Sequence, residues 1–271
     1  MTSLTHGGGA SAPVRLDGDP FDPAALGIAH FEHHAAVSST MDVAHTRAAA
    51  GAPHGTLIVA DRQEAGRGRG GKRWHSDAPT GLWMTWLLRD VRVAALEVLS
   101  LRVGLAVADA VAPWADGVTG LKWPNDVLTA AAPSIEAARA LPMRALAKLA
   151  GILVETRWRE GQLEWVAIGV GINLQPPAAP GLAPAALGAG VSRAALIARI
   201  AAPLLTSVLG TAHLSDAEAT RWRGLDLMRG RRATQPSAGL VAGVAPDGSL
   251  LVRGDDGIVR EHRSGSLEVA P

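Results

Sequence analysis

The sequence predicts an α+β fold, in which a mixed β-sheet is backed by helices and followed by a small all-β unit at the C-terminus. Strand-like apolar runs alternate with runs of helical periodicity up to about residue 228. After Arg229 the chain changes to short apolar runs separated by turn sequences. A chain of 271 residues that is 48% hydrophobic can bury a substantial core. We therefore expect a main domain over residues 28–228 and a second domain over residues 229–271.

The first 27 residues are expected to form a flexible tail. They begin with a stretch rich in Gly, Ser, Pro and Asp that has no hydrophobic periodicity. The tail is therefore left out of the predicted sheet and its helices.

Three helices are predicted in the main domain. Apolar residues recur at the helical spacing of three and four from Leu96 until Pro113 ends the run. A second helical run follows Ser192, which is a suitable N-cap residue. Ser215 and Glu218 have the spacing of a capping box, so a third helix should begin there.

Strand-like runs interleave with these helices at residues 56–60, 82–88, 120–123, 151–158 and 163–174. Residues 129–144 lie between two of the runs. They are rich in Ala and contain two prolines, which predicts an inserted loop with a short helix. In the C-terminal domain, the sequences at 246–249 and 254–257 are typical of turns between antiparallel strands.

Composition excludes several classes of protein. The formal net charge of +1 provides no long-range field that would attract nucleic acid or an anionic membrane. The chain has no cysteine, so disulfides, a thiolate nucleophile and cysteine-ligated zinc are excluded. We see no signal peptide and no run of the roughly 18 apolar residues that a membrane span requires. A cytoplasmic protein without membrane contact is the expectation.

The most informative segment is residues 63–74, QEAGRGRGGKRW. Its four glycines let the backbone fold closely around a ligand, and its Arg and Lys side chains suit a phosphate or carboxylate. We interpret it as a loop that wraps a small anion. Two alternatives stay open, namely a solvated basic loop and a nucleic-acid-binding module that uses residues 67–73.

Two further clusters place polar groups at the ends of predicted strands. Residues 122–126, KWPND, combine a cation, an amide and a carboxylate with a proline that stiffens the turn. Lys148 begins a strand in which Gly151 permits the close approach of a ligand. The alternative for residues 122–126 is an ordinary polar turn, and the alternative for Lys148 is an ordinary surface lysine.

In the second half of the strand at 163–174, large apolar residues alternate on one face from Val166 to Leu174, and the other face has little bulk. Its second face carries Gly169, Gly171 and finally the amide of Asn173. Such a face could form the floor of a site for a flat ligand. The alternative is that another strand or helix packs over the glycines.

Taken in order, the segments GRGRGGKRW, KWPNDVL, KLAGILVE and GVGINL resemble those of the biotin–protein ligase family. The resemblance runs from about Ser38 to the C-terminus. Within it, residues 38–40 are similar to the family's Ser-Thr contact to biotin, and roughly the last forty residues are similar to its SH3-like domain. Some members carry a helix-turn-helix repressor domain ahead of the ligase, but residues before Ser38 do not extend the resemblance. It therefore implies a stand-alone ligase that recognises no specific DNA.

The resemblance implies an ATP-dependent, AMP-forming ligase that makes biotinyl-5′-AMP and transfers biotin to a lysine of a biotin carboxyl carrier protein or domain. The implied fold is the catalytic domain of the lipoate and biotin ligases, which is similar to class II synthetases, with a small C-terminal SH3-like β-barrel. Mg²⁺ would accompany ATP, with no dedicated metal site in the protein. A monomer or a homodimer is expected.

The same resemblance implies roles for individual residues. The catalytic residues would be Lys148, Arg67 and Arg69. Contacts to biotin would come from Ser39, Thr40, Gln63, Arg67, Gly68, Arg69, Lys148 and Gly151. Contacts to ATP or the adenylate would come from Lys72, Trp74, Lys122, Asn125, Asp126 and Asn173.

This sequence departs from the family pattern at several positions. Met41 stands where the family usually has Asn, Gly70 where many members have Arg, and Lys72 where they have Arg. The segment at 129–144 is also longer than is common. Two further alternatives are a lipoate ligase on a related fold and a biotin-binding protein without catalytic activity. The loop at residues 63–74, called the Gly-Arg loop below, and the KWPND segment argue against the lipoate ligase.

Overall fold

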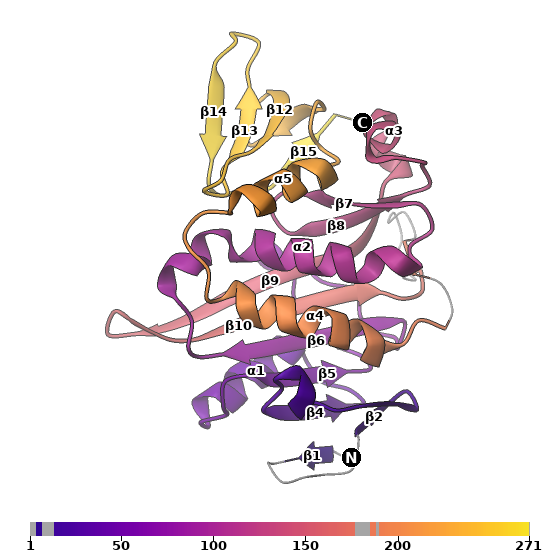
Figure 1. The fold of residues 1–271 in the computed structure, drawn as a ribbon, viewed down its shortest axis with the longest axis vertical. Coiled ribbons are helices and arrows are strands. Elements are labelled where there is room, and N and C mark those ends of the chain that lie inside the picture. Colours follow the sequence, from indigo (N-terminus) through magenta and orange to yellow (C-terminus); the bar gives the residue numbers. More distant parts are fainter. Residues whose placement is uncertain (1–3, 7–13, 177–184, 188–189, 271) are drawn as a thin grey trace.

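The computed structural model describes residues 4–6, 14–176, 185–187 and 190–270, and its centre is an eight-stranded sheet (Figure 1). The strand order is β1-β4-β5-β6-β10-β9-β8-β7. Strands β4 and β5 are parallel, and every other neighbouring pair is antiparallel. The predicted mixed sheet is thereby confirmed. Its strands are β1 (Leu4–His6), β4 (His30–His34), β5 (Thr56–Ala60), β6 (Gly81–Leu88), β7 (Val118–Lys122), β8 (Asp126–Ala130), β9 (Ala147–Arg159) and β10 (Gln162–Asn173).

Helices cover both faces of this sheet. Helices α2 (Leu99–Val111) and α4 (Arg193–Ser207) lie in front of it in Figure 1, and α1 (Thr40–Ala49) lies behind it. Helix α5 (Asp216–Leu225) packs beside α2 and β7. Because both faces are covered, β5 and β6 are buried along their whole length, which explains their uninterrupted apolar sequences.

Strand β10 divides its side chains between the two faces. Ile168, Val170 and Ile172 belong to the apolar core on the α2 side. The opposite face, which α1 shares, carries Gly169 and Gly171. The alternation predicted from the sequence therefore builds a packed face and an open face on one strand.

The predicted helices form with the expected caps. The Ser192 hydroxyl accepts a hydrogen bond from the Ala195 backbone N–H at 3.2 Å. Ser215 and Glu218 form the predicted capping box at the start of α5. Helix α2 is flanked by the 3₁₀ turns η3 (Val93–Val98) and η4 (Ala112–Trp114), so the run predicted from Leu96 to Pro113 is helical throughout.

The N-terminal segment differs from the predicted tail. Strand β2 (Val14–Leu16) pairs with β3 (Asp19–Phe21), and the turn η1 (Ala24–Leu26) follows. Leu16 and Phe21 are buried, and Arg193 donates a hydrogen bond to Asp17 at 2.6 Å. Two apolar side chains and one ion pair thus hold residues 14–27 on the main domain. The rest of the predicted tail includes residues 1–3 and 7–13, which lie outside the described residues.

The C-terminal unit is an open five-stranded sheet in the order β14-β13-β12-β11-β15. Its strands are β11 (Arg232–Gln235), β12 (Gly239–Val244), β13 (Leu250–Arg253), β14 (Val259–His262) and β15 (Glu268–Val269). The all-β prediction is confirmed, but the predicted closed barrel is not. The edge strands β14 and β15 do not pair with each other, and the two-residue strand β15 pairs with β11 alone.

The connection between β8 and β9, residues 131–146, contains helix α3 (Ile135–Ala140) and the turn η5 (Met143–Ala145). The short helix expected in the inserted loop is therefore present. In the part of the chain that the structure describes, none of the helices combines the length and the apolar character required to cross a bilayer.

Candidate functional site

Two adjoining cavities open on the face of the sheet where β10 carries its glycines. The first cavity, of about 50 Å³, is lined from α1, β6, β9, β10 and the Gly-Arg loop. The second cavity, of about 560 Å³, extends toward β7, β8 and the C-terminal sheet. Gly68, Arg69, Trp74, Asn125 and Lys148 line both. The two cavities therefore form one elongated site with a shared middle.

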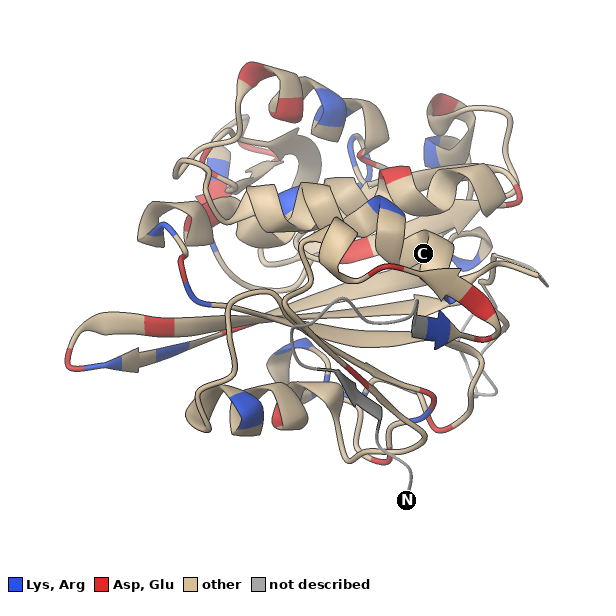
Figure 2. Ribbon diagram, turned by 60° about the horizontal axis from the view of Figure 1, so that its bottom comes forward, with Lys and Arg blue, Asp and Glu red and all other residues tan. Residues whose placement is uncertain are grey.

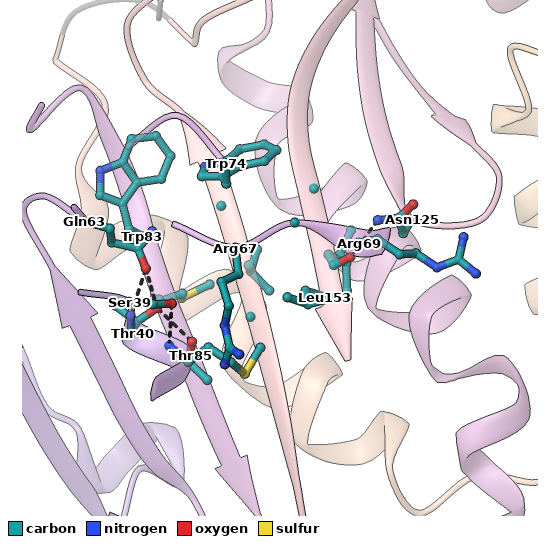
Figure 3. A pocket seen from close by; sticks show the side chains of 18 of the residues that line it. Ser39, Thr40, Gln63, Arg67, Arg69, Trp74, Trp83, Thr85, Asn125 and Leu153 are labelled. Carbon is teal, nitrogen blue, oxygen red and sulfur yellow. Dashed lines mark hydrogen bonds between the residues drawn. The ribbon is translucent and has the colours of Figure 1, made fainter. Parts of the chain in front are cut away.

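A buried network of hydroxyl and amide groups forms one wall of the first cavity (Figure 3). The Gln63 Oε1 accepts hydrogen bonds from the Thr40 backbone N–H at 2.8 Å and from its hydroxyl at 3.1 Å. The Thr40 and Thr85 hydroxyls lie 2.8 Å apart, and Gln63 Nε2 donates to Ser76 at 2.9 Å. Ser39 caps α1 beside them. These groups can exchange hydrogen bonds with a neutral polar ligand.

The floor of the first cavity consists of paired glycines beneath one indole ring. Gly151 on β9 lies opposite Gly171 on β10. A Cβ atom on either glycine would approach the Trp74 ring to 2.8 Å or 2.6 Å, which is closer than side chains pack. A larger residue at either position would therefore displace the Trp74 ring. Among the described residues, the buried Nε1 of Trp74 has no hydrogen-bond partner.

The glycine face is covered in two ways. The Trp74 ring of the Gly-Arg loop lies over Gly151 and Gly171, whereas helix α1 packs over Gly169 through Met41. Met41, at the start of α1, is buried beside Gly169 and also lines the first cavity. Because its thioether donates no hydrogen bond, Met41 contributes an apolar patch where the family usually has an amide.

The Gly-Arg loop folds back on itself above this floor. The Trp74 N–H donates to the Gly66 carbonyl at 2.8 Å, and the Gly68 N–H donates to the Lys72 carbonyl at 2.7 Å. At its tip, the turn η2 (Arg69–Gly71) contains two glycines with positive φ, Gly70 at 65° and Gly71 at 74°. The reversal depends on these two residues, because other residues rarely adopt such angles.

Arg67 and Arg69, two of the three arginines of the loop, point in different directions. The Arg67 Nη2 lies 2.9 Å from Asp42 and 3.2 Å from Glu155, so its guanidinium is held at the α1 side of the first cavity. Arg69 donates a hydrogen bond to the Gly265 carbonyl in the C-terminal sheet region. The loop therefore bridges the main domain and the C-terminal unit.

Lys148 lies where the cavities meet. Its Nζ is 2.6 Å from Asp126 Oδ1 and 5.0 Å from the centre of the Trp74 ring. Two amides fix the surrounding backbone: Asn173 donates to the Lys148 carbonyl at 3.0 Å, and Asn125 donates to the Ile152 carbonyl at 2.8 Å. The ammonium group can thus contact an anion that spans the shared middle.

All lysines of the chain line the second cavity. The sequence contains three lysines and 23 arginines, and Lys72, Lys122 and Lys148 all line this cavity. Burial lowers the pKa of Lys122, while the nearby Asp126 carboxylate raises it. Elsewhere along the described ribbon, basic residues are interspersed with acidic ones (Figure 2). The concentration of ammonium groups makes the second cavity suitable for a multiply charged anion.

The structure brings together every residue predicted for the site. All residues predicted to contact biotin line the first cavity, and all residues predicted to contact ATP or the adenylate line the second. Sequence reasoning missed Thr85, which is the only polar residue in β6 and could have been noticed for that reason. It also missed the walls supplied by Met143, Leu146 and residues 266–268. No local sequence signal connects those distant segments to the site.

Comparison with known proteins places this geometry in a family. Residues 34–173 match the model of the biotin/lipoate A/B protein ligase family. The bifunctional ligase/repressor BirA of Bacillus subtilis is 37% identical over 146 residues, which cover 54% of this chain and 40% of that protein. The biotin–[acetyl-CoA-carboxylase] ligase of Paracoccus denitrificans is 30% identical over 222 residues, which cover 74% of this chain and 85% of that protein. This chain thus spans less than half the length of the Bacillus relative.

Solved structures share the fold. The biotin protein ligase from Aquifex aeolicus in complex with biotin and ATP superposes with a TM-score of 0.65 at 22% identity, covering 89% of this chain and 98% of that one. The biotin protein ligase from Leishmania major in complex with biotinyl-5-AMP gives a TM-score of 0.57 at 22% identity, covering 85% of this chain and 97% of that one. The matched residues 34–173 include the Gly-Arg loop and the strands β6, β9 and β10, which line the first cavity. This chain belongs to the biotin/lipoate A/B protein ligase family.

Proposed function

We propose that the protein is an ATP-dependent biotin–protein ligase, which forms biotinyl-5′-AMP and transfers biotin to a lysine of a biotin carboxyl carrier protein or domain. The observation that carries the proposal is the pair of cavities with a shared middle. One cavity offers neutral hydrogen-bonding groups over a glycine floor, which suits the ureido ring of biotin. The other offers three ammonium groups, which suit a triphosphate.

The residue roles follow from this division. Ser39, Thr40 and Gln63 would bind the ureido group, and Gly151 would let the Trp74 ring lie close to the sheet beside biotin. Lys148 and Arg69 line both cavities and would contact the biotin carboxylate and the α-phosphate. Asn173 and Asn125 would act mainly by fixing the backbone around Lys148 and Ile152.

The reaction would proceed in two steps. A carboxylate oxygen of biotin attacks the α-phosphorus of ATP, a new P–O bond forms, and pyrophosphate leaves as the bond to the β-phosphate breaks. Negative charge develops on the phosphoryl oxygens, and a fixed ammonium at the shared middle stabilises it. The acceptor amine then attacks the acyl carbon, an amide bond forms, AMP leaves, and the amine releases its proton to solvent. No covalent enzyme intermediate is required.

We propose that Mg²⁺ enters with ATP and is coordinated mainly by phosphate oxygens, as is usual for this ion. Lys148 and Arg69 would contact the reacting carboxylate and phosphate, whereas Lys122 and Lys72 would neutralise the remaining phosphates. Arg67, which is now paired with Asp42 and Glu155, would act by closing the loop over biotin.

The alternatives have less support. The Paracoccus relative is named as a biotin–[acetyl-CoA-carboxylase] ligase, and the Gly-Arg loop and KWPND segment favour biotin over lipoate. A nucleic-acid module would not explain why Gly68, Arg69 and Lys72 line the cavities. A biotin-binding protein without activity would not explain the second cavity with its lysines.

Several finer assignments belong to the same proposal. Residues 28–228 would be the catalytic domain, and residues 229–271 would be an SH3-like domain whose sheet is open in this structure. We propose a cytoplasmic enzyme that acts as a monomer or homodimer and does not recognise specific DNA. The even mixture of charges along the ribbon and the net charge of +1 support the last point (Figure 2).

The test is pyrophosphate release by the purified protein with MgATP and either biotin or lipoate. Release that depends on biotin and is not supported by lipoate would establish biotin adenylation. Release with lipoate in preference to biotin would move the protein to the lipoate branch of the family. Biotin retention without release would indicate a binding protein, and salt-dependent binding of DNA or RNA without release would favour the nucleic-acid alternative.

A further inference from the structure

The Arg67 guanidinium ends in a cluster of charged groups at the edge of the first cavity. The side chain extends from the Gly-Arg loop across that cavity (Figure 3), and its Nη2 contacts Asp42 and Glu155. The three side chains are 38%, 46% and 31% exposed, and ion pairs that water can reach stabilise little. The position of Arg67 therefore depends on how firmly its carboxylate partners are themselves held.

Glu155 is held from behind by an imidazole of helix α1. The His45 Nε2 lies 2.8 Å from Glu155 Oε2, the same oxygen that accepts the Arg67 hydrogen bond at 3.2 Å. The other ring nitrogen of His45, Nδ1, lies 2.9 Å from the Nε1 of Trp165 in β10. Side chains of α1, β9 and β10 thus meet behind Arg67.

The indole of Trp165 sets the direction of every hydrogen bond in this chain. Its Nε1 carries a hydrogen and can only donate. The His45 Nδ1 must therefore accept, which places the proton of the neutral ring on Nε2. That Nε2–H donates to the Glu155 carboxylate, and Arg67 donates to the same carboxylate from the other side. Each donor in the chain faces an acceptor, so the arrangement is fully satisfied.

Trp165 gives this chain of hydrogen bonds a fixed origin. Its side chain is 8% exposed and packs with Ala48 of α1 and Leu87 of β6. The Arg89 guanidinium lies 5.7 Å from the centre of the indole ring and donates to the Ala48 carbonyl at 2.6 Å. The chain therefore begins at a buried side chain and ends at the loop. A fixed origin reduces the entropy that the outer groups lose when they become ordered.

His45 and Glu155 lie directly beside the proposed biotin site. Along β9, Leu153 lines the first cavity, and Glu155 is the next residue on the same face. Along α1, Met41 lines the cavity, and His45 follows one turn later. His45 and Glu155 themselves are not among the described residues that line the cavity. Any effect that they have on a ligand must therefore pass through a neighbour, and Arg67 is the neighbour that they share with the cavity.

We propose that His45 and Glu155 are positioning residues, which hold the Arg67 guanidinium over the first cavity and so stabilise the closed form of the Gly-Arg loop on biotin. This role rests on the proposed function, because biotin is taken as the ligand of the first cavity. Trp165 selects the tautomer of His45, His45 orients the Glu155 carboxylate, and Glu155 holds Arg67. The family resemblance assigns no role to His45, Glu155 or Trp165.

The test is the dissociation constant of biotin, measured by calorimetry without ATP, together with kcat for pyrophosphate release at saturating biotin. His45→Ala removes the donor to Glu155 and should weaken biotin binding about fivefold, while kcat and the KM for ATP stay near the parent values. His45→Gln keeps one acceptor and one donor and should restore most of the affinity. Glu155→Gln should weaken binding as well, because a neutral oxygen accepts from Arg67 less strongly than a carboxylate.

A double variant separates positioning from a general effect on the fold. In a protein that already carries Arg67→Ala, the change His45→Ala should leave the dissociation constant of biotin unchanged, because the group that His45 positions is absent. Equal fold losses of affinity with and without Arg67 would mean that His45 acts independently of it.

The matched control is His33→Ala. The His33 Nε2 lies 2.7 Å from Asp61, and these side chains are 25% and 30% exposed, compared with 27% and 31% for His45 and Glu155. Asp61 also accepts from Arg193 of α4, so this pair lies on the face of the sheet opposite α1. Its loss should leave biotin binding near the parent value.

Three results would overturn the proposed positioning role while biotin-dependent release still supports the proposed function. They are unchanged biotin affinity in both His45→Ala and Glu155→Gln, an equal loss of affinity in His33→Ala, and equal losses from His45→Ala with and without Arg67. A parent protein that neither binds biotin nor releases pyrophosphate in its presence would instead reject the proposed function, and the positioning role with it.

Discussion

Replacement of Lys148 by alanine is predicted to abolish most biotin adenylation while the protein remains folded. The Lys148 ammonium lies where the two cavities meet, and its nearest anion is Asp126 Oδ1 at 2.6 Å. In the proposed reaction it balances the charge that develops on the α-phosphate. Alanine removes this charge and leaves no other ammonium that lines both cavities among the described residues.

The structure allows the two effects of this change to be estimated separately. Removing one fixed donor at a centre of developing charge typically costs about 3–4 kcal/mol, which corresponds to a decrease in kcat of about 100-fold to 1,000-fold. The Lys148 side chain is 35% exposed, so loss of its pair with Asp126 should cost less than about 1 kcal/mol of folding free energy. Catalysis should therefore fall far more than stability.

The assay is single-turnover formation of biotinyl-adenylate, with thermal unfolding measured on the same samples. Lys148→Arg keeps the charge but not its shape, so we expect only partial recovery of the rate. Arg157→Ala removes a cation from the exposed end of the same strand and should react like the parent. A Lys148→Ala protein that forms the adenylate at near the parent rate would refute the role of this residue.

Three further predictions follow from the same geometry. When biotin and MgATP are bound, the backbone amides of residues 63–75 should exchange their hydrogens more slowly than in the free protein. The reason is that the free loop, with its four glycines, is costly to order, at about 1–2 kcal/mol per residue. Equal protection in both states would contradict this prediction. An amine-reactive ester should inactivate the protein and MgATP should protect it, since every lysine lines the second cavity; mass mapping that finds the same lysine labelling with and without ATP would refute this. Burial raises the pKa of Asp226 to about 6 from 3.8, so its charge opposes folding above pH 6 and this penalty is relieved as the pH falls to 3.8. Asp226→Asn, which can still accept from the Met228 N–H, should stabilise the protein by about 1–3 kcal/mol at pH 7.5 and not below pH 4, as chemical denaturation at the two values would reveal.

The sequence predicted the main sheet, its backing helices and the segments that line the candidate site. These features depend on local patterns. The apolar alternation of β10 requires one packed face and one open face, and the capping box at Ser215 fixes the start of α5. The family segments then indicated which strand ends meet, because each motif lies at an end of a strand or in the loop above it.

What the sequence did not reveal depends on contacts between distant segments. The buried positions of Leu16 and Phe21 were missed because they stand in a stretch rich in Gly and Pro, where no periodicity marks them. Helix α1 was missed because its alanines and polar residues carry only a weak apolar stripe. The placement of Trp74 over Gly151 and Gly171 could not be predicted either, because it requires the loop and both strands in three dimensions.

The C-terminal unit shows a second limit of sequence reasoning. Turn sequences correctly predicted several short strands, and Gly248 and Gly257 adopt the positive φ angles expected of them. Closure of a barrel, however, depends on the pairing of the two edge strands, here β14 and β15. No turn sequence specifies that pairing, so the open sheet could not be distinguished from a barrel in advance.

The most direct test of the central claim is the intact mass of a purified biotin carboxyl carrier domain after incubation with this protein, biotin and MgATP. We predict an increase equal to one biotinyl group, located on a single lysine, and no increase when ATP is omitted. The Lys148→Ala protein should give little product in the same time. A carrier domain whose mass stays unchanged with all components present, while an established biotin ligase modifies the same preparation, would contradict the assignment.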